Sequence, residues 1–311
     1  MTPLLTIVMP CYNEQENIPK VLPEVIAYCL QRNFRCIVVN DGSKDNSLAE
    51  LKKFNNEYFT VYTHSRNRGY GAAIKTGIRR CETEYVVTID ADGQHTLEDI
   101  DKMLEILIRE NADICVGNRN SKGSTALRNF AKSIIVRFSK AFINIKINDL
   151  NSGMKMYKTN VVKYMVKFAP NGMPFSDVIV LLFHQFRFKI IEEPISIKPR
   201  EHGTSTISYK TAIETLYEIM YIIIHFIPLR FFGAIGLAIL SFGIVWGAGF
   251  VAKGLGVTAG TALCVLSGLI FIGFGILLEI MLKLQFENYS PDIEDYHRSS
   301  ASTDSGAEIK K

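Results

Sequence analysis

The chain has 311 residues, with 35 lysine and arginine residues against 31 aspartate and glutamate residues, which gives a formal net charge of +4. The hydrophobic fraction of 48% and the charged fraction of 21% exclude a disordered chain, and the small positive charge argues against a dedicated nucleic-acid-binding protein. The length suits one large domain or two modest ones. The six cysteines form no CxxC pair, which favours a reducing compartment over a disulfide framework or a zinc site.

The N-terminal two thirds of the chain alternate short β-rich segments with helical segments. The predicted strands comprise residues 4–9, 35–40, 60–64 and 85–90. The predicted helices between them comprise residues 18–31, 46–55 and 71–80. This alternation predicts an α/β domain with a mainly parallel sheet. The ligand site of such a sheet lies at the carboxyl ends of its strands, and the sequence places unusual polar residues there, at 10–14, 41–43 and 90–95.

The segment Asp90-Ala91-Asp92-Gly93-Gln94-His95 follows a predicted strand. Its two carboxylates and the amide oxygen suit a hard divalent cation such as Mg²⁺ or Mn²⁺, which takes one or two protein carboxylates and completes its shell with phosphate oxygens and water. We therefore expect a metal at Asp90, Asp92 and Gln94. An Asp-x-Asp pair also occurs in exposed turns, and His95 alone is typical of an ordinary turn histidine.

Two further polar segments lie at predicted strand ends. Asp41 could accept a hydrogen bond from a ribose or a base, whereas Asp45 or Ser47 could cap the next helix. Gly71 belongs to a glycine-containing helix start at 67–73, where free N–H groups and the helix dipole favour phosphate. The segment lacks the Walker A and GxGxxG spacings, which disfavours P-loop ATPases and NAD-binding proteins.

Two runs without charged residues, 231–252 and 254–278, follow the α/β region and are separated by a hinge at 253–256. Each is long enough to cross about 30 Å of hydrocarbon as a helix, and the alternative is a buried hairpin in a soluble core. Arg230 and Lys283 flank the outer ends and Lys253 lies in the hinge, which favours a cytosolic N-terminal domain. No signal peptide is evident at the N-terminus. Residues 127–145 and 209–227 have amphipathic patterns, typical either of core-facing helices or of helices on a bilayer surface.

Four segments occur in the order seen in family 2 glycosyltransferases, and the chain resembles that family over most of residues 1–120. They are Pro10-Cys11-Tyr12-Asn13-Glu14, Asn40-Asp41-Gly42-Ser43 with Asp45, Asn67-Arg68-Gly69-Tyr70-Gly71 and Asp90-Ala91-Asp92-Gly93-Gln94-His95. The resemblance implies a GT-A fold, a single nucleotide-sugar-binding α/β domain. Segments at 117–119, 149–153 and 193–205 resemble the dolichol-phosphate mannose synthase subgroup, whose members transfer a sugar from a nucleotide diphosphate to a polyprenyl monophosphate.

The resemblance and the needs of this reaction assign expected roles. The residues expected at the nucleotide sugar are Pro10, Tyr12, Glu14, Asp41, Gly71 and Asp90. The residues expected to grip the lipid phosphate are Arg119, Arg128, Ser133, Lys155 and Ser205. Asp92 and Arg200 are the expected catalytic residues, and Asp177 is an alternative base because an anionic acceptor phosphate could attack without one, with inversion.

Three departures from the subgroup pattern stand out. Met154 and Lys155 follow Gly153, where the subgroup usually carries an arginine nearby. Arg128 and Ser133 match only with the spacing altered by one residue, which makes Lys132 an equal candidate. Thr206 stands where relatives often have lysine.

We predict four regions along the chain. They are a cytosolic GT-A domain at 1–207, an interfacial amphipathic helix at 208–228, a transmembrane helical hairpin at 229–284 and a polar, disordered tail at 285–311. The protein would be an integral membrane enzyme of a cell inner membrane or its endoplasmic-reticulum equivalent, with the catalytic domain on the cytosolic face.

The expected partners are a nucleotide-sugar donor, a polyprenyl or dolichyl phosphate acceptor and the lipid bilayer, with no nucleic acid. GDP-mannose and UDP-sugars stay open as donors, as does homo-oligomer formation. A processive polysaccharide synthase is disfavoured, because the single tryptophan, Trp246, lies in a predicted span and cannot form the Gln-x-x-Arg-Trp motif. The alternatives are a nucleotidyltransferase and a non-catalytic membrane adaptor that retains the nucleotide-sugar-binding fold.

Overall fold

The computed structural model describes residues 2–54, 56–119, 147–198, 217 and 220–287. The chain divides into two units, Met1–Thr215 and Leu216–Lys311. The predicted amphipathic segment 127–145 and the tail beyond 287 lie outside the described residues, as do Arg128, Lys132, Ser133, Arg200, Ser205 and Thr206.

The first unit is built on one sheet, whose strands within the described residues number seven. They are β1 (Leu5–Cys11), β2 (Arg35–Asn40), β3 (Phe59–Thr63), β4 (Tyr85–Thr88), β5 (Ile114–Asn118), β6 (Lys155–Lys158) and β7 (Ile190–Pro194). Their order is β3-β2-β1-β4-β6-β5-β7, and β6 alone among them runs antiparallel to its neighbours. The predicted mainly parallel α/β sheet is therefore confirmed. The strand order reverses between β1 and β4, which in open sheets creates a crevice at the carboxyl ends of those strands.

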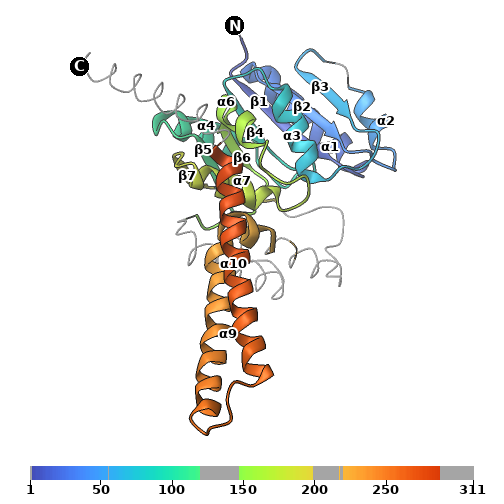
Figure 1. The fold of residues 1–311 in the computed structure, drawn as a ribbon. Coiled ribbons are helices and arrows are strands. Elements are labelled where there is room, and N and C mark those ends of the chain that lie inside the picture. The colour runs from blue at the N-terminus through green and yellow to red at the C-terminus, as the bar shows by residue number, and fades with distance from the viewer. Residues whose placement is uncertain (1, 55, 120–146, 199–216, 218–219, 288–311) are drawn as a thin grey trace, which may run out of the picture. The chain divides into compact units, whose positions relative to one another are not determined.

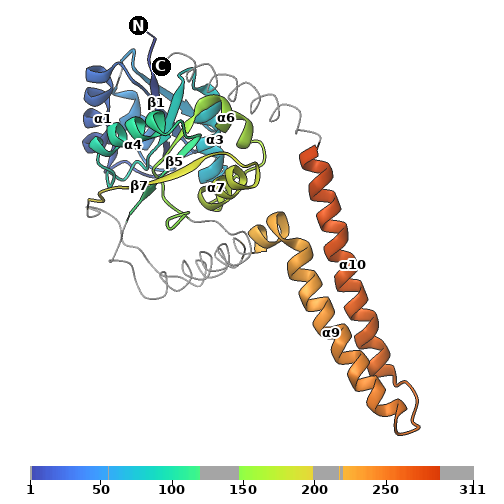
Figure 2. The same cartoon turned by 90° about the vertical axis from the view of Figure 1, so that its left-hand side faces the viewer.

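Helices cover both faces of this sheet (Figure 2). They are α1 (Ile18–Arg32), α2 (Ser47–Lys52), α3 (Tyr70–Arg80), α4 (Glu98–Arg109), α6 (Thr159–Met165) and α7 (Phe175–Gln185). The alternate residues Leu5, Ile7 and Met9 of β1 pack in the core with α1 and α4. Val8 faces the other side, where it lies so close to Gly77 of α3 that a larger residue at 77 would collide with it. Both faces of the central strands are thus buried, as a parallel sheet requires.

The boundaries at the candidate site differ from the prediction in one informative place. The fourth strand ends at Thr88, not at residue 90, because its partner β6 begins at Lys155, which pairs with Thr88. The carbonyl of Gly153 accepts a hydrogen bond from the Thr88 hydroxyl at 2.9 Å, just beyond the paired stretch. Ile89 and Asp90 therefore belong to the loop that follows β4.

The second unit contains two long helices, α9 (Pro228–Val251) and α10 (Ala259–Glu287), which pack side by side (Figure 1). Gly236 and Gly268 allow the close approach, because a Cβ on Gly236 would lie 2.7 Å from the Gly268 carbonyl oxygen. The turn between the helices contains Gly254 and Gly256 with φ of 75° and 72°, left-handed conformations that glycine adopts readily. The predicted hinge and the two long apolar helices are confirmed.

Both helices are long and apolar enough to cross a membrane. Their most apolar 18-residue windows have mean hydropathies of 2.1 and 2.4, and only 17% of each window is buried. Most apolar side chains of α9 and α10 are therefore not covered by other residues of this unit. The core helix of a soluble protein, in contrast, would have most of its apolar side chains buried. Residues 220–226, which precede α9, are also helical, and the rest of the predicted interfacial segment up to 219 is described only at residue 217.

Candidate active site

The loops after β1 and β2 are held together by hydrogen bonds between them. The backbone N–H of Asn13 donates to the Ser43 hydroxyl at 3.0 Å, and the N–H of Glu14 donates to the Ser47 hydroxyl at 2.8 Å. The N–H of Lys44 donates to Oδ1 of Asn13 at 2.9 Å in return. Asn13 has a positive φ of 56°, which asparagine tolerates better than most residues. Two loops 30 residues apart in the chain thus form one rigid rim of the crevice.

Three residues predicted at the nucleotide sugar lie on this rim. Pro10 pairs with Val39 near the end of β1, one residue before the strand ends. Tyr12 is 39% exposed, so its ring is available to a ligand. Glu14 is half-buried, and its Oε2 accepts a hydrogen bond from the Asn17 side chain at 2.6 Å.

Asp41 is buried, and protein groups surround its carboxylate. Its Oδ1 lies 2.6 Å from Nδ1 of His64 and accepts a hydrogen bond from the Arg68 N–H at 2.9 Å, while Oδ2 accepts one from the Gly69 N–H at 2.8 Å. The carboxylate therefore fixes the loop between β3 and α3. This geometry gives Asp41 an ordering role that the sequence analysis did not foresee, and its predicted contact with a nucleoside stays a prediction.

Gly71 lies at the start of α3 against the loop that precedes α7. A Cβ at this position would lie 2.5 Å from the Pro170 carbonyl oxygen and 2.7 Å from Cβ of Phe175. The next N–H, that of Ala72, donates to the Asn171 carbonyl at 2.9 Å. This N–H at the helix start is thus satisfied by protein, and the glycine serves close packing here.

Asp90 follows β4 and is surrounded on three sides. Its Oδ1 accepts a hydrogen bond from the Tyr70 hydroxyl at 3.1 Å, and its Oδ2 lies 3.6 Å from Nε2 of His95. Gly153 lies directly against the carboxylate, where a Cβ would overlap Oδ2. Burial raises the pKa of the Asp90 carboxyl, but the nearby His95, the Tyr70 hydroxyl and the charge of Arg119 outweigh it, so the net pKa is lowered. Asp90 is held as a carboxylate in one orientation.

The rest of the acidic segment forms a tight turn that contacts the end of the domain. The N–H of Gln94 donates to Oδ1 of Asp92 at 3.2 Å, and Gly93 between them has a φ of 74°. His95 forms an antiparallel bridge with Ile197, and the Lys198 N–H donates to the Gln94 carbonyl at 2.8 Å. The acidic segment is thereby paired with the residues directly before 199–216. Within the described residues, Nδ1 of His95 is buried and has no hydrogen-bond partner, which the prediction of an ordinary turn histidine did not anticipate.

Arg119 forms a two-pronged ion pair with Asp149. Its Nε lies 2.8 Å from Oδ2 and its Nη2 3.0 Å from Oδ1 of Asp149, and the same Nη2 donates to the Asn151 carbonyl at 2.6 Å. The Asp149 side chain is only 3% exposed. Burial lowers the pKa of Arg119, but the hydrogen bond and charge of Asp149 outweigh it and raise the net pKa. The predicted lipid-phosphate ligand thus already has a buried carboxylate partner.

Lys155 and Asp177 lie in the same charged region and are both almost fully buried. The Lys155 ammonium donates to the Ser152 carbonyl. Burial lowers the pKa of Lys155 to about 8, against the opposing charge of Asp177. Asp90, Arg119, Asp149, Lys155 and Asp177 form a charge network behind the acidic segment, because the electrostatic interactions of Arg119 and Lys155 include all three carboxylates. Burial makes Lys155 a poor direct ligand for a lipid phosphate, and Asp177 lies in the first turn of α7, consistent with a role in this network.

The oxygen groups of the acidic turn suit a cation that binds together with a phosphate-containing substrate better than they suit a permanently bound metal. Among the described residues, no three side chains of histidine, cysteine, aspartate or glutamate converge as a metal cage. Asp90 and Asp92 supply carboxylates and Gln94 an amide within one short turn. Magnesium and manganese are commonly held by one or two carboxylates together with substrate phosphates and water, and carboxylates are among the oxygen groups that the acidic turn carries.

Three residues that support the acidic turn and Arg119 had no predicted role. Tyr70, Asp149 and Gly153 lie in segments quoted for the resemblance, yet no role was predicted for them. The signal for Gly153 was the Ser-Gly pair itself, since a glycine within a predicted site often marks a close backbone approach. The contact of Tyr70 with Asp90 joins α3 to the loop after β4, and no local pattern in the sequence indicates it.

The family of the chain follows from its match to known proteins. Residues 6–165 match the model of the family described as glycosyl transferase family 2. The chain belongs to this family and is therefore a glycosyltransferase, as the resemblance predicted.

Relatives and solved structures agree with this membership. The chain is 27% identical over 295 residues to an undecaprenyl-phosphate 4-deoxy-4-formamido-L-arabinose transferase of Pseudomonas fluorescens, covering 90% of this chain and 85% of the relative. A transferase of the same name from Proteus mirabilis is 25% identical over 296 residues, covering 90% of this chain and 89% of the relative.

Two solved structures have a similar fold. Glucosyl-3-phosphoglycerate synthase from Mycobacterium tuberculosis, solved with Mn²⁺ and UDP, superposes with a TM-score of 0.56 at 14% identity over 71% of this chain and 79% of that one. Mannosyl-3-phosphoglycerate synthase from Rubrobacter xylanophilus gives a TM-score of 0.51 at 13% identity over 70% and 72% of the two chains. These structures show the same fold, which confirms the predicted GT-A architecture.

Proposed function

We propose that this glycosyltransferase moves a sugar from a nucleotide diphosphate donor to a polyprenyl monophosphate at a membrane surface. The observation that carries the proposal is the extent of the match to the undecaprenyl-phosphate transferases. It covers 90% of this chain, well past the family 2 region that ends at residue 165. Family 2 membership alone would leave the acceptor open.

The two apolar helices support a lipid acceptor. A soluble acceptor would not require a transferase to remain at the bilayer, whereas a polyprenyl phosphate is confined there by its hydrocarbon chain. The hairpin α9–α10 leaves its apolar surface uncovered within its unit, which suits burial in lipid. The orientation we propose has the domain at 1–207 on the cytosolic side, the segment 208–228 at the interface, the hairpin at 229–284 in the bilayer and the tail at 285–311 outside it.

The acidic turn supports a nucleotide diphosphate donor. Asp90, Asp92 and Gln94 are all partly exposed, and Asp90 is held in place by Tyr70 and Gly153. A bound Mg²⁺ or Mn²⁺ would neutralise charge on the donor diphosphate and so make it a better leaving group. The rim formed by 10–14 and 43–47 offers Tyr12 and Glu14 to the nucleoside.

The transfer step we propose is a single displacement. An oxygen of the acceptor phosphate, already anionic at neutral pH, attacks the anomeric carbon as the bond from that carbon to the donor diphosphate breaks. The nucleoside diphosphate leaves with the bonding electrons, and the anomeric configuration inverts. No strong base is needed, which agrees with an Asp177 that lies buried beside Lys155 and Arg119. Arg128, Ser133, Arg200 and Ser205 stay the predicted ligands of the acceptor phosphate.

A donor screen tests the proposal. Full-length protein in detergent is mixed with polyprenyl phosphate, Mn²⁺ and radiolabelled GDP-mannose, UDP-glucose, UDP-GlcNAc or nucleotide-linked 4-deoxy-4-formamido-L-arabinose. We expect label to enter the organic phase with one donor and to be lost in Asp92→Ala. Glu105→Ala, which removes an exposed carboxylate from α4, is the matched control and should retain activity.

Two results would contradict the proposal. Donor binding without transfer to any polyprenyl phosphate would favour the adaptor alternative or another acceptor. Near-normal transfer by Asp92→Ala would show that the acidic turn does not take part in the reaction.

Arg200→Ala should weaken use of the lipid phosphate more than nucleotide binding, and equal losses would point to a structural role for Arg200.

A further inference from the structure

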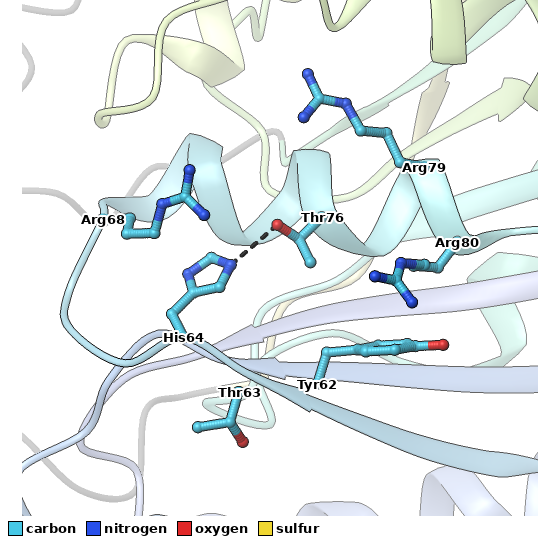
Figure 3. Close-up of a pocket in the computed structure, with 7 residues that line it drawn as sticks. All are labelled: Tyr62, Thr63, His64, Arg68, Thr76, Arg79 and Arg80. Atoms are coloured by element: carbon cyan, nitrogen blue, oxygen red, sulfur yellow. Dashed lines mark hydrogen bonds between the residues drawn. The ribbon is translucent and has the colours of Figure 1, made fainter.

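A polar pocket whose lining includes no residue of the acidic turn lies between the edge strand β3 and the helix α3 (Figure 3). Its volume is about 310 Å³. Tyr62, Thr63 and His64 line it from the strand side, and Thr76 lines it from the helix side. None of the roles derived above for the donor or the acceptor uses this pocket.

Three arginines give the pocket its charge. Arg68 lines it just before α3, and Arg79 and Arg80 line it at the end of that helix. Within the described residues, none of the three forms an ion pair, and neither β3 nor α3 contains an acidic residue. Basic residues in the last turn of a helix interact favourably with the helix dipole. This interaction explains in part why Arg79 and Arg80 occur there, but it does not explain Arg68.

The walls of the pocket are already ordered. His64 contacts Thr76 through Nε2 at 2.9 Å and Asp41 through Nδ1 at 2.6 Å, so both of its ring nitrogens are engaged. The guanidinium of Arg80 lies 4.7 Å from the centroid of the Tyr62 ring. The ring contacts the flat face of the guanidinium, so the N–H groups at the guanidinium edge stay available to a ligand. A ligand would therefore enter a pre-formed site, which reduces the entropy cost of binding.

The spacing of the arginines limits the ligand. An 11-residue helix is about 16 Å long, so Arg68 and the Arg79–Arg80 pair approach the pocket from opposite ends. Because three arginines line one cavity of about 310 Å³, a ligand with two or more phosphate groups suits it better than a single phosphate, since it offers anionic oxygens to each guanidinium. Arginine is well suited to such groups, because its donors form paired hydrogen bonds with phosphate oxygens.

We propose that the β3–α3 pocket is a second anion-binding site that takes a ligand with several phosphate groups. The source can be a soluble polyphosphate or the clustered phosphates of lipid headgroups. The site lies on the far side of His64 from the Asp41 carboxylate, and Arg68 belongs to the loop that Asp41 fixes. Ligand binding at Arg68 would thus stabilise the loop between β3 and α3, which is held by the Asp41 carboxylate. The proposal does not depend on the identity of the donor or the acceptor.

Calorimetry with inorganic triphosphate tests the site on the full-length protein in neutral detergent. EDTA is present throughout, so that binding through a metal at the acidic turn is suppressed. We expect saturable binding that weakens at least tenfold in Arg68→Gln/Arg79→Gln. Arg109→Gln, which removes an exposed arginine from α4, is the control and should bind as the wild type does. Equal thermal unfolding temperatures show that the variants are folded.

Short-chain lipids then identify the source. Displacement of triphosphate by dioctanoyl phosphatidic acid, but not by dioctanoyl phosphatidylcholine, assigns the site to lipid headgroups, and resistance to both assigns it to a soluble polyphosphate. The proposal is overturned if triphosphate does not bind, if the double variant binds as tightly as the wild type, or if one equivalent of nucleoside diphosphate displaces it without metal. The last result would make the pocket part of the donor crevice.

Discussion

The hydroxyl of Tyr70 donates a hydrogen bond to Oδ1 of Asp90, so the first residue of α3 contacts the first carboxylate of the acidic turn. This contact joins two segments that the chain separates by 20 residues. It also means that the orientation of Asp90 depends on the position of α3, which the loop fixed by Asp41 sets in turn.

Removal of the Tyr70 hydroxyl tests this dependence. A hydrogen bond to a charged group contributes about 1.5–3 kcal/mol, so Tyr70→Phe should lower kcat/KM about tenfold or more while the fold is kept. Steady-state transfer rates and thermal unfolding measure the two effects. Tyr58→Phe, at a tyrosine packed against the core of the opposite face, is the control and should leave the rate unchanged. A rate for Tyr70→Phe equal to that of the control would show that Asp90 needs no such support.

Gly153 provides the other side of the Asp90 cradle. A methyl group at 153 would overlap the carboxylate, so Gly153→Ala should displace Asp90 and abolish most transfer. Gly172→Ala is the matched control, because the atom nearest to its added Cβ is Cδ of Pro174 at 3.5 Å, an ordinary contact. Activity assays on both variants at equal protein concentration give the comparison. Full activity in Gly153→Ala would require the 152–154 segment to move freely.

The Arg119–Asp149 pair should contribute mainly to stability. Breaking a buried ion pair leaves an uncompensated charge, which costs about 3–5 kcal/mol, so Arg119→Gln should lower the free energy of unfolding by about that amount. Arg32→Gln breaks the more exposed pair with Asp101 and should cost about 1 kcal/mol or less. Chemical denaturation in detergent measures both. Unchanged stability in Arg119→Gln, with weakened use of lipid phosphate, would instead support the role predicted from the sequence.

The buried thiols should make the first unit less stable at alkaline pH. Burial raises the pKa of Cys29 to about 12, whereas a thiol in an unfolded chain has a pKa of about 8.5. Between these values the folded chain keeps a proton that the unfolded chain releases, so this contribution to stability is complete below pH 8.5 and is lost as the pH rises toward 12. The loss is at most about 1.4 kcal/mol per pH unit for each thiol.

Substitution of one thiol isolates this effect. Cys29→Ala should reduce the fall in the free energy of unfolding between pH 8.5 and 10.5, measured by denaturant titration under reducing conditions. Val25→Ala creates a cavity in the same helix without removing a thiol, so it should lower stability at every pH and keep the wild-type slope. Identical slopes in Cys29→Ala and the wild type would contradict the prediction.

Local patterns in the sequence predicted the strands well where both neighbours were strands of similar length. The strand at 35–40 has the predicted bounds, because β1 and β3 pair with it along its length. The strand that was predicted to end at Asp90 is two residues shorter, because its end is set by β6, whose first residue Lys155 lies 67 positions after Thr88. Hydrophobic runs alone identified α9 and α10, since a membrane-length run needs no tertiary information.

The candidate site was predictable to the extent that its chemistry is local. Asp90, Asp92 and Gln94 share one turn, and their spacing was visible in the sequence. Arg119 and Lys155 were assigned to the lipid phosphate from the resemblance and from the need for basic groups at the acceptor phosphate. Their carboxylate neighbours come from positions 149 and 177 and meet them only through the packing of β5, β6 and α7. Burial of a charge is a tertiary property, and a single sequence does not encode it in any local pattern.

The pairing of β5 with β7 has a consequence for how the enzyme can be divided. The family 2 match ends at residue 165 and so includes β5 and β6. In the sheet, however, β5 also pairs with β7, which lies beyond the match at 190–194. The Ser196 N–H also donates to Oδ2 of Asp99 at 2.7 Å, so the start of α4 is anchored by residues beyond the match. A fragment cut at 165 would expose β5 as an unpaired edge and release the start of α4. The minimal folding unit is therefore longer than the segment by which the family is recognised, and a soluble version of the enzyme should extend at least through residue 198.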